Sequence, residues 1–140
     1  MPAVAPLSSA RHATLAALLF TLPLAACTRT LELVDLKTGF VLTGTHSPWN
    51  RSMSVELPAG ETARGTYTKL TTAEIVPESL FFGATAGELL GRHAIGQIYG
   101  YARLIGERGA IVEIIFTSDW LGHGTGVART SFKEKYRVTF

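Results

Sequence analysis

The sequence predicts an all-β protein, built as a small antiparallel β-sandwich or barrel of about eight short strands. Three observations indicate this class. Beyond residue 27, short runs rich in β-branched and aromatic residues recur between turn signals. Several runs alternate apolar and polar residues, as strands with one buried and one solvent-facing side do. The same region contains no long stretch with the 3.6-residue periodicity of an amphipathic helix.

The expected strands are separated by turns in which glycine, proline or asparagine interrupts the apolar runs. In the clearest strand, Met53, Val55 and Leu57 face one way and the polar residues between them face the other. Residues 51–70 and 94–117 each predict a hairpin. All the expected strands are 30–36, 40–45, 51–57, 62–70, 94–105, 110–117, 122–130 and 135–140, with a loop at 46–50.

Small residues are concentrated before and within the expected strand 94–105. Gly96, Gly100 and Ala102 share one strand face, which indicates strong curvature or close packing. The stretch 83–100 is interpreted as a glycine-rich loop or a bent strand, and a helix that packs closely through Gly83, Gly87 and Gly91 is the less favoured alternative. It lacks the glycine-lysine motif that cradles phosphates, so nucleotide binding is not expected. A barrel of this size would hold little inside beyond its own side chains.

Residues 1–26 have the features of a secretory signal peptide. They contain no Asp, Glu or Lys, and Arg11 is their only full charge. The apolar run that follows it is shorter than the roughly 20 residues of a membrane-spanning helix, and Pro23 interrupts its end. Two other interpretations stay open: an ordinary secreted protein with an incidental cysteine, and a cytosolic protein with an apolar first helix.

The end of this run, Leu24-Ala25-Ala26-Cys27, resembles the lipobox of bacterial lipoproteins. In that family the cysteine thiol receives a diacylglycerol, the signal peptide is cut just before it, and the new amino group is acylated with palmitate. The resemblance implies a lipid on Cys27 and no other cofactor. It also implies a signal peptide at 1–26 and a single periplasm-facing β-domain at 27–140.

The residue after the cysteine bears on localisation. An Asp there tends to hold Gram-negative lipoproteins in the inner membrane, so Thr28 implies the periplasmic face of the outer membrane. The Gly-x-Gly-x-Gly pattern at 122–126, followed by Tyr136-Arg137, resembles small proteobacterial lipoproteins of unknown function. That second resemblance covers under a third of the domain and implies no activity.

Charge and cysteine content exclude several function classes. Of the 13 Lys and Arg residues, Arg11 lies in the signal, which leaves 12 against 11 Asp and Glu. The basic residues are scattered singly, so nucleic acid is not an expected partner. Cys27 is the only cysteine, and once acylated it leaves no thiol for a disulfide or a metal.

Two histidine arrangements suggest chemistry but do not establish it. His123 follows Ser118 and Asp119 closely, yet a catalytic triad is a spatial arrangement, and the sequence has no Gly-x-Ser-x-Gly nucleophile elbow. No catalytic residue is therefore assigned, and the protein is predicted not to be an enzyme. The trio of His46, His93 and His123, with Asp119 or Glu113, lacks the tight local spacing of zinc ligands, so no metal site is predicted.

Aromatic residues in expected loops are better candidates for binding. Trp49, Trp120 and Tyr99, with Tyr101 beside it, could form a stacking surface for a glycan or a protein. The first three are predicted as partner contacts. The alternative for each is ordinary core or edge packing.

The predicted function is that of a lipid-anchored outer-membrane lipoprotein, acting as a structural or accessory binding component of an envelope assembly. Its expected partners are the membrane, through the anchor, and an envelope protein or peptidoglycan. Two alternatives are kept. One is an envelope hydrolase that uses His123 and Asp119. The other is a small-ligand-binding β-barrel, which would need an apolar internal cavity.

Overall fold

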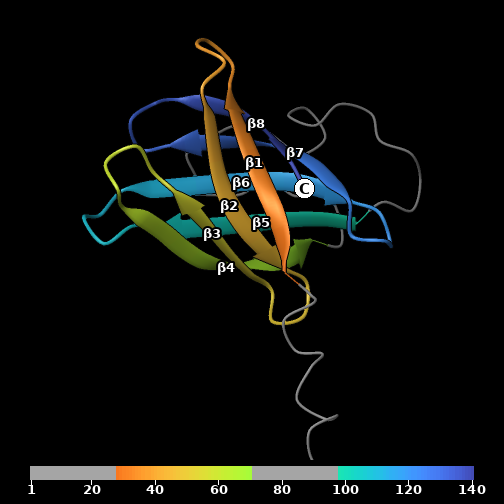
Figure 1. Cartoon of the computed structure of the whole chain (residues 1–140). Coiled ribbons are helices and arrows are strands. Elements are labelled where there is room, and N and C mark those ends of the chain that lie inside the picture. The colour runs from red at the N-terminus through yellow and green to blue at the C-terminus, as the bar shows by residue number, and fades with distance from the viewer. Residues whose placement is uncertain (1–27, 71–97) are drawn as a thin grey trace, which may run out of the picture.

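The computed structural model describes residues 28–70 and 98–140. These residues form eight antiparallel strands that close into a barrel, as Figure 1 shows. The predicted all-β class is confirmed, and of the two architectures the barrel is the one that forms. The strands are β1 (Arg29–Asp35), β2 (Val41–Ser47), β3 (Ser52–Glu56), β4 (Thr62–Leu70), β5 (Ile98–Ile105), β6 (Ile111–Ser118), β7 (Gly124–Thr130) and β8 (Lys135–Thr139).

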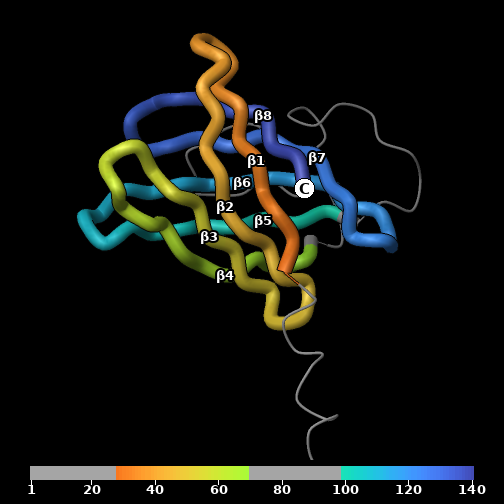
Figure 2. Tube along the Cα trace, viewed as in Figure 1, coloured from red at the N-terminus to blue at the C-terminus, as the bar shows by residue number. Residues whose placement is uncertain are grey.

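Each strand pairs with the next along the chain, and β8 pairs back with β1 to close the barrel (Figure 2). Both predicted hairpins are confirmed, since β3 pairs with β4 and β5 pairs with β6. Closure leaves no strand of the barrel with an unpaired edge. Within the described residues, no helix has the length and apolar character needed to cross a membrane.

The up-and-down order gives the barrel two distinct ends. We call the end where β1 begins the proximal end. It also carries the loops at 48–51 and 119–123 and residue 140. The distal end carries the β1–β2, β3–β4, β5–β6 and β7–β8 turns. The predicted turn glycines Gly39, Gly60 and Gly109 lie at the distal end, each with a positive φ that favours glycine.

Every second side chain of each strand points inward, and these side chains fill the barrel. Alternation along β3 places Met53 and Val55 inside, as the sequence predicts. Gly100 leaves space that the ring of Phe116 fills, so the expectation of close packing along β5 is confirmed there. The buried apolar side chains include Leu31, Leu33, Leu42, Met53, Val55, Ala63, Tyr67, Ala102, Leu104, Val112, Ile114, Phe116, Ala128, Tyr136 and Val138.

The outer face of β6 is buried as well as its inner face. Glu113, Ile115 and Thr117 on that outer face are all shielded from solvent. Glu113 forms an ion pair with Arg103 of β5, at 3.9 Å. Burial, followed by the charge of Glu113 and a hydrogen bond to it, raises the pKa of Tyr101 to about 12. Tyr101 is therefore an uncharged phenol that forms a hydrogen bond with the Glu113 side chain.

The structure corrects one element of the expected pattern. The loop expected at 46–50 begins later, because His46 and Ser47 are the last two residues of β2. His46 continues the inward alternation of Leu42 and Gly44, and its side chain is buried. Several predictions concern residues outside the described ranges: the signal peptide, Cys27, His93 and the part of the glycine-rich stretch that precedes residue 98.

Gly44→Ala is expected to lower the free energy of unfolding by about 1–3 kcal/mol, as overpacking of a core does. A Cβ atom at Gly44 would collide with the backbone carbonyl oxygen of Ser54, so β2 and β3 would have to part. The neighbouring exposed Thr43 provides the control: Thr43→Ala should cost less than about 1 kcal/mol. Urea unfolding measures both changes, and equal losses would contradict the close approach of these strands.

Candidate functional site

A pocket of about 130 Å³ lies at the proximal end of the barrel. Strands supply its buried walls, and the two proximal loops supply its exposed rim. Pockets that combine apolar walls with a few polar groups are the usual binding sites of proteins. The lining residues are His46, Pro48, Tyr67, Lys69, Tyr99, Phe116, Ser118, Asp119, Trp120 and Gly122.

His46 is the unusual member of this lining. Its side chain is only 3% exposed, and in the described part of the chain three aromatic rings lie around it. Its ring centroid lies 4.6 Å from that of Phe140, 5.3 Å from that of Tyr67 and 6.4 Å from that of Phe116. Among the described residues, neither Nδ1 nor Nε2 has a hydrogen-bond partner. Buried polar atoms in proteins are nearly always paired, so two unpaired ring nitrogens beside a pocket require an explanation.

The surroundings keep His46 uncharged near neutral pH. Burial lowers its pKa below the usual 6.5, and the positive charge of Arg29 lowers it further. Arg29 is the residue of β1 that pairs with His46 across the β1–β2 ladder. A neutral imidazole has one donor nitrogen and one acceptor nitrogen. The buried wall of the pocket therefore contains one hydrogen-bond donor and one acceptor, both uncharged and unpaired among the described residues.

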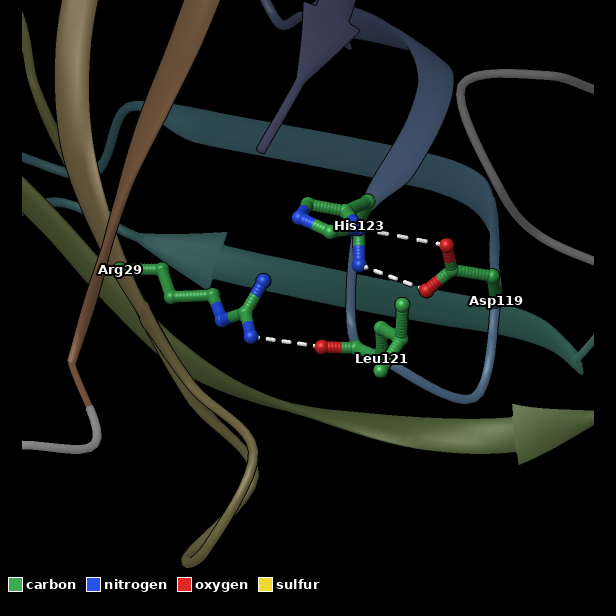
Figure 3. Close-up of polar contacts among 4 residues, drawn as sticks. All are labelled: Arg29, Asp119, Leu121 and His123. Carbon is green, nitrogen blue, oxygen red and sulfur yellow. Dashed lines mark hydrogen bonds and ion pairs between the residues drawn. The ribbon is translucent and has the colours of Figure 1, made fainter.

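The β6–β7 loop at the pocket rim is held by polar contacts, which Figure 3 shows. The Arg29 guanidinium donates a hydrogen bond of 2.6 Å to the Leu121 carbonyl oxygen. The Asp119 carboxylate accepts a 2.9 Å bond from the His123 backbone N–H, and its other oxygen lies 3.3 Å from His123 Nδ1. Partial desolvation acts to raise the pKa of Asp119, but the hydrogen bonds and charge of His123 outweigh it and lower that pKa.

The proposed hydrolytic pair is therefore in contact but lacks a third member among the described residues. The His123 and Asp119 side chains are 66% and 43% exposed, on a surface depression that Thr117 and Thr125 also line. No hydroxyl in residues 28–70 and 98–140 hydrogen-bonds to His123. The contacts that are present stabilise the turn at 119–123, as the side chain of Asp commonly does in turns.

The structure separates the candidate zinc ligands that it describes. His46 lies in the barrel pocket, His123 lies on the exposed loop, and Glu113 lies on the outer face of β6. In the part of the chain that the structure describes, no three His, Cys, Asp or Glu residues come together to hold a metal ion. His93, the third histidine of the trio, falls outside that part.

The predicted contact aromatics gather at the proximal end. Trp49 and Trp120 are 85% and 87% exposed, one in each proximal loop. Trp120 and the half-buried Tyr99 also line the pocket. Their role as contact residues stays a prediction. Sequence reasoning missed His46 as a pocket residue, although it continues the two-residue alternation of Leu42 and Gly44, which was a usable signal.

The free energy of unfolding should fall when the pH is lowered from about 7.5 to about 5. The pKa of His46 is below 6.5 in the folded state, so the unfolded chain binds a proton first and acid favours unfolding. Among the described residues, the charged groups that act on the imidazole or line the same pocket are Arg29, Lys69 and Asp119. The lowered pKa values of Asp35 and Asp119 also stabilise the folded state, but this stability is lost mainly as the pH falls below their usual pKa of 3.8, outside the range measured.

Urea unfolding at the two pH values measures this effect. His46→Leu should remove the loss of stability between them, because it removes the group that titrates. His123→Gln, which changes an exposed histidine, should retain the loss. The same pH dependence in the protein with and without His46 would contradict the assignment.

Comparisons with protein-family models, with curated proteins and with solved structures found no match to this chain. A function for it is therefore inferred from its own residues and their geometry. The features available are the barrel, its proximal pocket with His46, the two exposed tryptophans and the cysteine motif that precedes β1.

Proposed function

We propose that the protein is a lipoprotein anchored to the periplasmic face of the outer membrane through Cys27, and that its barrel is a non-enzymatic binding component there. Covalent geometry supports a short tether. Cys27 precedes Arg29 by two residues, so its Cα is within about 8 Å of the first residue of β1. Acyl chains on Cys27 would therefore hold the proximal end against the membrane surface.

One observation carries this proposal. Only Thr28 separates the lipobox from β1 at the proximal end. The same end exposes both tryptophans. Tryptophan is enriched at membrane–water interfaces, where its apolar ring and its polar N–H are both accommodated. Leu121 is exposed beside Trp120, and Arg51 and Lys69 add positive charge at this end. Such a surface suits contact with lipid headgroups.

The distal end would then face the periplasm and be accessible to an envelope protein. Leu36 and Phe40 are exposed in the β1–β2 turn, and Phe132 is exposed in the β7–β8 turn. A backbone hydrogen bond from Leu36 to Lys135 ties the first of these turns to β8. Exposed apolar side chains on neighbouring turns favour a protein partner over peptidoglycan, because glycan strands offer little apolar surface to cover them.

Cys27→Ala should abolish incorporation of labelled palmitate and leave the precursor uncut by the lipoprotein signal peptidase, because the thiol is the acceptor of the lipid. Metabolic labelling and the electrophoretic mobility of the product measure both effects. Thr28→Asp is the matched control: it should keep acylation and shift the protein from the outer-membrane to the inner-membrane fraction. Normal processing of Cys27→Ala would exclude the lipoprotein assignment.

Tryptophan fluorescence tests the orientation, since Trp49 and Trp120 are the only tryptophans in the chain. In the lipidated protein reconstituted into vesicles, we expect a blue-shifted emission and quenching by brominated lipids. Trp49→Phe and Trp120→Phe assign the signal to each side chain. Emission as red-shifted as that of a water-exposed indole, with no quenching by brominated lipids, would show that the proximal end faces away from the membrane.

A further inference from the structure

The geometry points to a function beyond anchoring. The proximal pocket binds a small, neutral aromatic compound that has a single ring and one hydroxyl group, as phenol does. The inference rests on the pocket and on His46, and it does not depend on the lipid at Cys27. Four properties of the site lead to this class: its volume, its walls, its unpaired imidazole and its charge distribution.

The volume limits the size of the ligand. The pocket holds about 130 Å³. A protein cavity of about 150 Å³ with apolar walls takes up benzene. One six-membered ring with a single substituent therefore fills the pocket, whereas a fused polycyclic compound would extend beyond its open side.

The walls favour an aromatic ring over an aliphatic chain. Tyr67 and Phe116 meet edge to face, with ring centroids 5.4 Å apart. Tyr99 and Trp120 add two more aromatic surfaces around the same pocket. Aromatic pairs in edge-to-face or offset arrangements gain about 0.5–1.5 kcal/mol beyond the effect of buried area. A flat ring can make such contacts, and a flexible chain cannot.

The imidazole of His46 requires a polar group on that ring. Both of its nitrogens are buried and unpaired, and leaving such a group unpaired is costly. A ligand hydroxyl can donate to the acceptor nitrogen or accept from the donor nitrogen. A hydrocarbon in the same place would leave both nitrogens unpaired, so the site discriminates between ligands by that one group.

The charges around the pocket favour a neutral ligand. Lys69 and Asp119 line it with opposite signs. An anion would meet the Asp119 carboxylate, and a cation would meet Lys69 and the nearby Arg29. The Arg29 guanidinium is also already engaged with the Leu121 carbonyl oxygen. The buried wall, formed by His46, Tyr67 and Phe116, carries no charge of either sign, and an unpaired ligand charge against it is costly.

The test uses the mature lipidated protein in detergent, with ring-¹⁵N-labelled histidine, and follows the His46 resonances by NMR. The His46→Leu spectrum identifies them by their absence. Phenol, anisole and benzene are titrated in turn, and benzoate tests the exclusion of anions. We expect phenol to shift the His46 resonances saturably and to bind about tenfold more tightly than benzene, as one added hydrogen bond to a buried group allows. Anisole, which cannot donate, shows which nitrogen the ligand uses.

The controls separate the site from the rest of the protein. Thr43→Ala should leave phenol binding unchanged, because Thr43 is exposed on β2 and does not line the pocket. His46→Leu should abolish the preference for phenol over benzene, measured by competition for the pocket. The comparison of phenol with benzene on the unaltered protein stands even if that variant fails to fold. Three results would overturn the inference: equal affinities for phenol and benzene, tighter binding of benzoate, or resonances that show water as the only partner of His46 at millimolar phenol.

Discussion

The pairing of β1 with β8 is the constraint on which the rest of this structure depends. It runs from Glu32 opposite Thr139 to Asp35 opposite Tyr136, and it joins strands about a hundred residues apart. Closure converts a meander with two open edges into a barrel with a sealed interior. It also brings Phe140, which follows β8, against His46 of β2. The burial of His46, and therefore its neutral state, follows from this pairing.

An even number of strands in up-and-down order also determines which loops lie near the cysteine motif. Strand β1 begins at the proximal end, so every second connection returns there. The loops with Trp49 and Trp120 are thereby placed beside the link to Cys27, although Trp120 is far from it in sequence. The contact between Arg29 and Leu121 stabilises this arrangement, because it ties the first residue of β1 to the β6–β7 loop.

Local patterns were sufficient for the strands but not for their closure. Alternation around Met53 and Val55 identified β3, and turn glycines such as Gly60 identified the hairpins. The choice between sandwich and barrel depended on the long-range pairing of β1 with β8, which has no local signal. The pocket was equally hidden, because its described lining comes from four strands and two loops. His46 was misplaced because the turn signal of Ser47-Pro48 outweighed two further residues of alternation.

The two proposals place the pocket and the anchor at one end, and this has a consequence for selectivity. Neutral aromatic compounds with one polar group concentrate at the membrane interface for the reason that tryptophan does. A pocket at that level would also meet lipid acyl chains in large excess. An acyl chain entering it would cover the unpaired nitrogens of His46 without bonding to them, whereas a ring with a hydroxyl group would pair one. The buried imidazole would thus act as a filter against the most abundant apolar groups nearby.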